Sequence, residues 1–349
     1  MRRSKSSSRP QFAGPGVTDA NGPGVTDANG PGVTDANGPG VTDANGPGGA
    51  AGGRRRPRSV ILPYLLVLPT LIFVAMFTIW PTISSLLGSF FLQRLNIAKY
   101  REPTFAGFAN YATLFHDPTF YQVLGNTAFY VLGSVPVSIA LGFLFALLIN
   151  RRMRGIGLAR LALFHPTVLP MVSVATVWLF LLTPDYGLFN SALSFIGYRG
   201  AQNWTGNPDL ALLAIIFVAI WKNAGYYMIF YLAGLQSLPR EVFEAARLDG
   251  AGALTTTRKI TLPLLRRTSL FVTTIAFIGA FQSVDHVFVL TSGGPSNASN
   301  ILLYYLWQVR FENLNVGVAS ALTIVLIALL LMFTVSNFLI SERKGNLDG

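Results

Sequence analysis

Long apolar stretches alternate with short polar connections along most of the chain. A bilayer core about 30 Å thick requires about 20 mostly apolar residues in a helix. Six stretches meet this requirement: Leu62 to Phe91, Val123 to Ile149, Leu161 to Leu182, Leu210 to Gln236, Thr268 to Leu290 and Leu314 to Ile340. Two prolines inside the first stretch predict a kink rather than an end, because neighbouring helices can satisfy the freed backbone groups. The pattern predicts an all-α membrane protein with six transmembrane helices.

The polar connections differ in their basic residues, and this difference predicts the orientation of the chain. Lys and Arg are retained on the cytoplasmic side of a membrane. The second-to-third and fourth-to-fifth connections are rich in Arg, whereas the third-to-fourth and fifth-to-sixth connections hold only Arg199 and Arg310. The first connection is expected outside although it carries Arg94, Lys99 and Arg101, so it gives the weakest support for this orientation. We expect a multi-pass protein with both termini in the cytoplasm.

Composition agrees with a membrane protein and removes several classes of function. Hydrophobic residues make up 51% of the chain and charged residues 12%, about half the charged share of a soluble domain. The absence of cysteine excludes disulfides, Cys-based metal sites and thiol nucleophiles. Scattered histidines lack metal-ligand spacing, so no metal site is expected. The net charge of +11 resides beside the apolar stretches, which is typical of membrane topology and not of nucleic-acid binding.

The start of the chain has a different character. Residues 14–45 repeat GPGVTDAN in tandem, a Gly- and Pro-rich unit that buries too little apolar surface to offset its ordering entropy. We interpret residues 1–58 as a disordered cytoplasmic tail. A calcium-binding or solenoid array is the alternative, and a single Asp per unit speaks against it. The late first apolar stretch predicts that there is no cleaved signal peptide.

The connection between the fourth and fifth stretches is long and patterned. It reads SLPREVFEAARLDGAGALTTTRKITLPLLRRTS. Ser237 is a candidate N-cap, Pro239 suits a first helical turn, and Gly250 can supply a left-handed C-terminal turn. These signals predict a helix of about three turns over residues 239–250. Its small alanines and flanking charges favour docking into a protein groove; an amphipathic helix on lipid headgroups is the alternative.

This connection also carries a family motif. The motif comprises Glu244, Ala245, Ala246, Asp249, Gly250, Ile260, Leu262 and Pro263, and it resembles the EAA motif of ABC importer permeases. The sequences WKNAGYYMIFYLAGLQ from Trp221 and FQSVDHVFVLTSGGP from Phe281 are similar to carbohydrate permeases of the maltose and glycerol-3-phosphate type. The resemblance extends from about Ile61 to Ser341 and excludes the repeats.

The resemblance implies an architecture and a set of partners. For residues 59–345 it implies the six-helix fold of type I (MetI-like) ABC importer permeases in a bacterial plasma membrane. The EAA helix of this family sits in a cleft of a separate ATPase subunit, which implies an ATPase-coupling role for the motif. The implied partners are a second permease subunit, two ATP-binding subunits and an extracytoplasmic solute-binding protein.

The chain itself lacks a nucleotide-binding loop. No Gly-Lys dipeptide occurs in the sequence, which excludes a phosphate-binding loop of the nucleoside-triphosphatase type. We therefore expect that the chain is not an enzyme and binds no cofactor. ATP and Mg²⁺ are expected on the partner ATPase.

Polar side chains in the fourth and fifth stretches are candidates for the translocation pathway. They are Lys222, Asn223, Tyr226 and Asp285, the last of them toward the outer end of the fifth stretch. A cation in the middle of a span costs about 2.5 to 3.5 kcal/mol on insertion scales, so Lys222 should face protein or water. Pairing of its ammonium group with a neighbouring carbonyl is an equal alternative to a role in transport.

The connection after the fifth stretch predicts a tight turn at Gly293, Gly294 and Pro295. In similar permeases this region lies outside the membrane at the mouth of the pathway, near the docked binding protein. The resemblance thus implies gating or partner contact, and a purely structural turn is the alternative.

These features together predict the permease subunit of an ATP-driven importer for a carbohydrate, either a sugar, an oligosaccharide or glycerol-3-phosphate. The subunit would form half of a pathway that works by alternating access. A secondary carrier is one alternative, although it would place several ionisable residues in its spans and show inverted repeats. A non-transporting membrane scaffold is the other.

Overall fold

The computed structural model describes residues 61–150, 155–197 and 202–345. The predicted tail with its repeats lies outside these residues. So do Arg151, Arg152 and Arg154 of the second-to-third connection, and Arg199 of the third-to-fourth.

Four helical runs of the described chain are long and apolar enough to cross a membrane. The first run joins α1 (Ile61–Val74), η1 (Ala75–Ile79) and α2 (Trp80–Gly88) without interruption. The others are α4 (Pro118–Ile149), α8 (Pro208–Gln236) and α15 (Val316–Gly345). Two bent pairs also pass the length and hydropathy test, which makes six spans if each pair is one span. The prediction of an all-helical membrane protein with six spans is confirmed, with two of the spans broken.

The first bent pair replaces the straight third helix that the sequence predicts. It consists of α5 (Ile156–Val168) and α6 (Met171–Leu181), which meet at 101°. Leu169 between them is extended, with φ −72° and ψ 141°, because a residue before proline is pushed out of the helical region and Pro170 follows. The break is therefore encoded by Pro170.

The second bent pair forms the fifth span and the segment that precedes it. The segment from Ala253 to Leu264 comprises α10 (Ala253–Thr256), η3 (Thr257–Thr261) and α11 (Leu262–Leu264). It meets α12 (Arg266–Gln282) at 73°. The span thus ends at Gln282, eight residues before the predicted end at Leu290.

Proline accounts for two π-helical segments. η1 ends two residues before Pro81, and η3 ends two residues before Pro263. A proline in a helix has no amide hydrogen and its ring clashes with the carbonyl four residues earlier. Local widening to a π turn accommodates this clash without ending the helix. The kink predicted in the first span therefore takes the form of a π segment.

Short elements connect the spans. Among the described residues they include a two-stranded antiparallel pair, β1 (Phe91–Leu92) and β2 (Thr104–Phe105), in which Phe91 faces Phe105. The other short helices are η2 (Ala98–Tyr100), α3 (Ala109–His116), α7 (Leu188–Phe195), α9 (Arg240–Leu248), α13 (Asp285–Leu290), α14 (Leu302–Trp307) and η4 (Gln308–Glu312).

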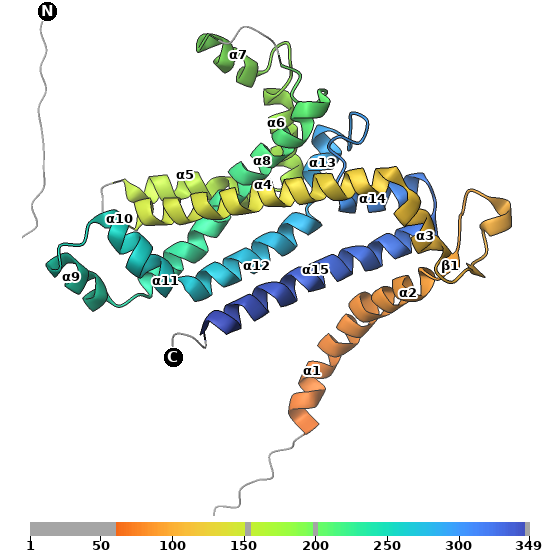
Figure 1. Ribbon diagram of the computed structural model, residues 1–349, viewed down its shortest axis with the longest axis horizontal. Coiled ribbons are helices and arrows are strands. Elements are labelled where there is room, and N and C mark those ends of the chain that lie inside the picture. The colour runs from red at the N-terminus through yellow and green to blue at the C-terminus, as the bar shows by residue number, and fades with distance from the viewer. Residues whose placement is uncertain (1–60, 151–154, 198–201, 346–349) are drawn as a thin grey trace, which may run out of the picture. The chain divides into compact units, whose positions relative to one another are not determined.

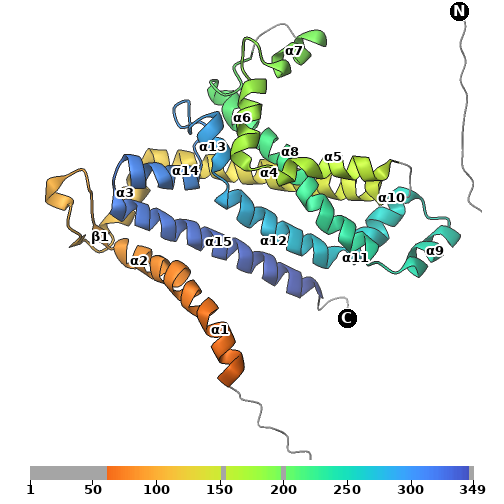
Figure 2. The same ribbon diagram turned by 180° about the vertical axis from the view of Figure 1, so that it is seen from behind.

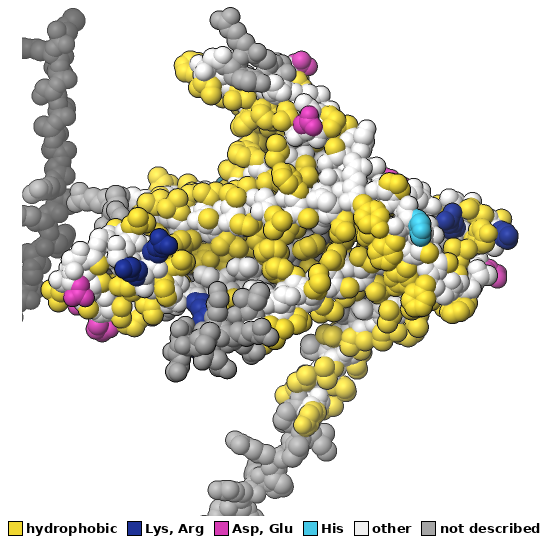
Figure 3. Space-filling model, viewed as in Figure 1, with side chains coloured by type: hydrophobic (Ala, Val, Ile, Leu, Met, Phe, Trp, Pro, Cys, Tyr) yellow, Lys and Arg dark blue, Asp and Glu magenta, His cyan; other side chains and the backbone are white. Residues whose placement is uncertain are grey.

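The core of the bundle lies along α4 and α8, which contact each other over much of their length. Figure 1 and Figure 2 both show α12 between α4 and α15. Large side chains such as Tyr130, Ile215 and Met228 are fully buried at the centre. Hydrophobic side chains also cover much of the outer face of the helices, whereas charged side chains gather at the ends of the bundle (Figure 3). Such a surface fits a bilayer and not water.

At one end of the bundle, the carboxylate of Asp117 joins α4 to α14 through hydrogen bonds. Asp117 caps α4 by accepting from the backbone N–H of Thr119 at 2.8 Å, and the hydroxyl of Tyr305 in α14 donates to its other oxygen at 2.7 Å. Partial burial alone would raise the pKa of Asp117, but the hydrogen bonds from Tyr305 and Thr119 outweigh it and lower the pKa. Burial, followed by the bond to Asp117 and its negative charge, raises the pKa of Tyr305.

Tyr305→Phe should lower the free energy of unfolding by about 1 kcal/mol at pH 7, since Asp117 loses its donor and is only partly buried. The pKa of Asp117 in the folded protein lies below the ordinary value of 3.8. The stabilisation is therefore complete above that pH and is lost as the pH falls through the folded pKa. Thermal unfolding in detergent at pH 7 and at acid pH measures the difference.

Tyr64→Phe serves as the control, because Tyr64 is 72% exposed. A destabilisation by Tyr305→Phe that is equal at both pH values would contradict the assignment to the Asp117 carboxylate.

Candidate functional site

The predicted coupling helix is present as α9, at the end of the bundle where α8 ends and α10 begins (Figure 1). It spans nine residues, slightly fewer than predicted. At its C-terminus Gly250 has φ +74°, and two bonds close the turn, from Ala251 N to Ala246 O at 2.9 Å and from Gly250 N to Arg247 O at 3.1 Å. This is a Schellman ending, which favours glycine because only glycine adopts positive φ without cost. The predicted left-handed turn at Gly250 is confirmed.

Ser237 does not cap α9, and this part of the prediction is wrong. Its hydroxyl donates to the carbonyl of Gly234 at 2.8 Å, so it ends α8. Pro239, extended at ψ 134°, directly precedes α9, and its side chain accepts no hydrogen bond from the first amides of the helix. The N-terminus of α9 therefore starts without a side-chain cap in the described chain.

The two faces of α9 have different surroundings. Ala246 is 5% exposed and is the buried residue of the helix. The motif residues Glu244, Ala245, Asp249 and Gly250 are exposed. Leu248, which the sequence analysis did not single out, is 89% exposed. The helix thus presents a small, charge-flanked face with one projecting leucine to whatever lies beyond the bundle.

The second half of the motif lies on a different element. Ile260 is in the π segment η3, and Leu262 and Pro263 begin α11, directly before the 73° bend. Leu265 at the bend is buried, with 1% exposure. The motif therefore extends from an exposed helix to the bend of the fifth span.

Two of the four predicted pathway residues line a cavity inside the bundle, called here the bundle cavity. It has a volume of about 220 Å³ and is bounded by α4, α8 and α12. Asn223 and Tyr226 lie on its α8 wall. The amide nitrogen of Asn223 donates to the carbonyl of Ala219 at 2.9 Å.

Hydroxyl groups that the sequence analysis missed complete the bundle cavity. The α4 wall carries Tyr130, Ser134 and Ser138, and Ser283 follows α12. The four-residue spacing of the first three places them on one face of a helix. This spacing is the sequence signal that could have identified them. No charged side chain lines this cavity among the described residues.

Lys222 points away from the bundle cavity and closes the break between α5 and α6. Its ammonium group donates to the carbonyls of Leu169 at 2.6 Å, Pro166 at 3.2 Å and Thr167 at 3.5 Å. These carbonyls belong to the end of α5, where the last turn of a helix lacks intrahelical donors and carries the negative end of the dipole. The carbonyl pairing proposed as an alternative for Lys222 is the contact observed.

A glycine permits this contact by letting α5 approach α8 closely. A Cβ atom at Gly225 would lie 2.0 Å from the carbonyl oxygen of Leu163, a distance that no side chain tolerates. Thr167 adds a further bond, from its hydroxyl to the carbonyl of Lys222 at 3.3 Å. The end of α5 is thus fixed against the middle of α8.

Asp285 lies outside the span in which the sequence analysis placed it. The helix stops at Gln282 because Ser283 is extended, with ψ 117°, and Asp285 is the first residue of α13. Its side chain is exposed and does not line the bundle cavity. The structure therefore separates Asp285 from Asn223 and Tyr226.

The predicted turn after the fifth span is present and is held firmly. Gly293 has φ +76° and Gly294–Pro295 is a cis peptide. Ser299 donates to the carbonyl of Gly294 at 2.6 Å, and Asn126 of α4 donates to the carbonyls of Asn297 and Asn300 at 2.7 and 3.0 Å. The structural-turn alternative accounts for these contacts. A role in gating or partner contact stays a prediction.

Comparison with known proteins identifies relatives over most of the chain. A family model described as binding-protein-dependent transport system inner membrane component matches residues 135–345. A probable ABC transporter permease protein of Bacillus subtilis, YurN, is 34% identical over 274 residues, which are 77% of this chain and 92% of the relative. The sn-glycerol-3-phosphate transport system permease protein UgpA of Escherichia coli (strain UTI89) is 33% identical over 291 residues, 82% of this chain and 96% of the relative.

The trehalose/maltose transport system permease protein MalF of Thermococcus litoralis is 33% identical over 280 residues, which cover 80% of this chain and 92% of the relative. Among solved structures, a chain of a bacterial ABC transporter involved in the import of alginate superposes with a TM-score of 0.71 at 24% identity. That match covers 81% of this chain and 96% of the other. It shows that the two chains share a fold.

Lys222→Met should lower the free energy of unfolding by about 1 to 3 kcal/mol, because three carbonyls at the end of α5 lose their donor. Lys222→Arg, which keeps a cationic donor, should restore most of this loss. Thermal unfolding of the purified protein in detergent measures both variants. A Met variant that unfolds like the wild type but shows a changed KM for uptake would instead place Lys222 in contact with the solute.

Proposed function

The chain belongs to the family of binding-protein-dependent transport system inner membrane components, and we propose that it is the carbohydrate permease subunit of an ATP-binding cassette importer. In this proposal it forms half of the translocation pathway and couples to a separate ATPase through α9. The observation that carries the coupling role is the helix itself, which is closed by a Schellman turn and exposes Glu244, Ala245 and Asp249 at the end of the bundle.

The position of α9 in the chain supports coupling. It follows α8 directly and leads through α10 and η3 into α12. Both α8 and α12 line the bundle cavity. A displacement of α9 by an ATPase would therefore act on two walls of the cavity through its covalent connections, directly on α8 and through α10, η3 and α11 on α12, which is what alternating access requires.

The chemistry of the bundle cavity favours a neutral carbohydrate over a sugar phosphate. Sugars are recognised by hydroxyl and amide groups and by aromatic rings, and Ser134, Ser138, Asn223 and Tyr226 supply these on the described walls. A phosphate would need a cation, and Lys222, the cation closest in sequence, is engaged by the carbonyls of α5. Glycerol-3-phosphate is therefore the less favoured cargo.

The first span supports association with a second permease. Its large apolar side chains are exposed from Tyr64 to Leu87, for example Leu66 at 72% and Phe77 at 65%, and no part of its most apolar window is buried. A membrane helix that packs so little against its own bundle is available to a neighbouring subunit. Two ATPase chains that hold ATP and Mg²⁺, and an external solute-binding protein, complete the proposed complex in the bacterial plasma membrane.

Uptake by proteoliposomes tests the proposal. The full chain is purified with its co-purifying subunits, reconstituted, and supplied with the binding protein and a neutral maltodextrin or trehalose. Uptake should require enclosed ATP and should persist when the proton gradient is dissipated. Uptake driven by a proton gradient without ATP would indicate a secondary carrier, and a lack of uptake of every sugar together with retained partner binding would indicate a scaffold.

Glu244→Lys should reduce ATP-dependent uptake at least about tenfold, equivalent to about 1.4 kcal/mol, because it reverses a charge on the exposed face of α9 that meets the ATPase. The amount of protein in the membrane should not change, since Glu244 is exposed. Uptake and co-purification of the ATPase measure the effect.

Glu102→Lys is the matched control, the same charge reversal at an exposed residue of the connection between the first two spans. Equal uptake by the Glu244 variant and the wild type would remove the coupling role from α9.

A further inference from the structure

A second and larger cavity lies where the spans end and α9 begins, and it is called here the end cavity. Its volume is about 1530 Å³, above the range of about 300 to 1,000 Å³ that is usual for small-molecule clefts. The ends of α4 and α8, the start of α5, and the segment from α9 to η3 form its walls. It therefore sits at the level where an apolar bundle gives way to a polar connection.

The walls of the end cavity divide into an apolar part and a basic part. The last turns of α4 contribute Leu144, Leu147 and Leu148, of which Leu144 and Leu148 are 47% and 51% exposed. These leucines are continuous with the apolar surface of the bundle. A ligand in the cavity could reach the bilayer interior along them.

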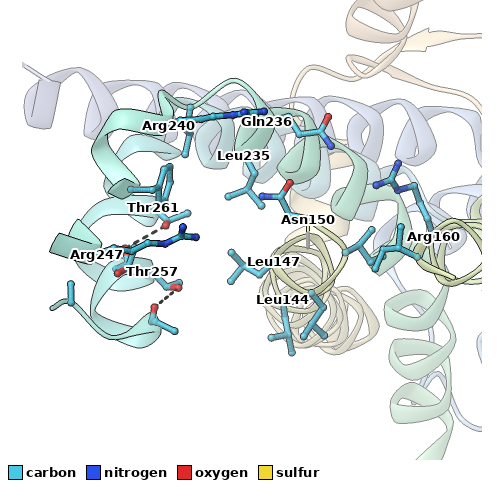
Figure 4. A pocket seen from close by; sticks show the side chains of 18 residues that line it. Leu144, Leu147, Asn150, Arg160, Leu235, Gln236, Arg240, Arg247, Thr257 and Thr261 are labelled. Carbon is cyan, nitrogen blue, oxygen red and sulfur yellow. Dashed lines mark hydrogen bonds between the residues drawn. The ribbon is translucent and has the colours of Figure 1, made fainter. Parts of the chain in front are cut away.

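Three arginines form the basic part, and they come from separate elements. Arg160 extends from α5, whereas Arg240 and Arg247 lie at the two ends of α9. Figure 4 shows Arg247 directed into the gap between α9 and the end of α4, with Arg240 above this gap and Arg160 on the opposite side of the end of α4. No carboxylate lines the cavity in the described part of the chain, and none of these guanidinium groups forms an ion pair there.

The threonines of the end cavity do not neutralise this charge. The hydroxyls of Thr256 and Thr257 donate to the carbonyls of Gly252 and Ala253 at 3.1 and 2.9 Å. Their oxygen atoms add no negative charge to the wall. The three arginines are exposed, and three cations around one space whose described wall carries no carboxylate favour an anionic ligand.

We propose that the end cavity binds an anionic phospholipid from the inner leaflet, with its headgroup at the wall that carries Arg160, Arg240 and Arg247 and its acyl chains along the leucines of α4. The proposal rests on the cytoplasmic position of α9 in the proposed function. Basic pockets between helices at the cytoplasmic face suit anionic headgroups. A free phosphate satisfies the arginines but leaves the apolar wall uncovered, so the phospholipid is the better match.

The lipid has a consequence for α9. Two of the three arginines belong to the coupling helix, and the third belongs to α5. A bound phosphate would therefore link α9 to the bundle at a point away from its covalent connections. The exposed face with Glu244 and Ala245 stays free for a partner.

Binding to the purified full chain, with its co-purifying subunits in neutral detergent, tests the proposal. The probes are dioctanoyl phosphatidylglycerol, dioctanoyl phosphatidylcholine and inorganic phosphate, and the readouts are the thermal unfolding midpoint and the lipid retained in native mass spectrometry. Phosphatidylglycerol alone should raise the midpoint. Arg160→Gln and Arg240→Gln should each weaken its affinity about fivefold, the change expected from the loss of one basic contact at a membrane surface.

Arg267→Gln is the control, an exposed basic residue of α12 that does not line the cavity, and it should bind like the wild type. Equal effects of phosphatidylglycerol and phosphatidylcholine, equal effects of phosphatidylglycerol and inorganic phosphate, or unchanged affinity in the two cavity variants would each overturn the proposal. Normal ATP-dependent uptake without lipid retention would overturn this proposal alone. Lipid retention without ATP-dependent uptake would count against the transport function alone.

Discussion

A bilayer offers the backbone no hydrogen-bond partner, so every peptide group at membrane depth must find one within the protein. Straight helices meet this requirement by themselves, and α8 and α15 do so within the membrane, whereas Pro136 removes one amide hydrogen from α4. The break between α5 and α6 does not, because several carbonyls at the end of α5 have no intrahelical donor. Lys222 supplies that donor from α8, and the remaining architecture depends on it: a broken span remains stable only where a neighbouring helix closes it.

Closure of the break also determines where the predicted pathway residues lie. Lys222 and Asn223 are adjacent in sequence, yet successive side chains of a helix point about 100° apart. With Lys222 held against α5, Asn223 and Tyr226 face α4 and α12 and line the bundle cavity. Gly225 permits this arrangement, since a side chain there would collide with the carbonyl of Leu163. One helix, α8, thus supplies both the cation that closes the break, Lys222, and the uncharged polar side chains of Asn223 and Tyr226 that line the bundle cavity.

The sequence was sufficient to predict features that depend on hydropathy or on the backbone conformation of a single residue. Six apolar stretches predicted the spans, and Gly250 predicted the end of α9. Features that depend on contacts between distant segments were not predicted. Pro170 was the sequence signal for the α5–α6 break. A criterion based on hydropathy does not register a single proline, so the two helices were predicted as one stretch. Ser237 has the composition of a cap for α9, yet its hydroxyl reaches the carbonyl of Gly234 in the preceding helix first.

The proposed coupling of α9 to the bundle cavity depends on the links between them. Rigid spans transmit displacement, whereas flexible connections absorb it, so coupling requires short links between the docking helix and the walls of the cavity. Only Ser237, Leu238 and Pro239 separate α8 from α9. On the other side, Leu265 at the bend is buried, so in the proposed coupling a rotation of α9 and η3 would act on α12 about this point. If α9 couples to an ATPase as proposed, the length of the motif follows from this layout, since it includes both the docking helix and the bend that leads into α12.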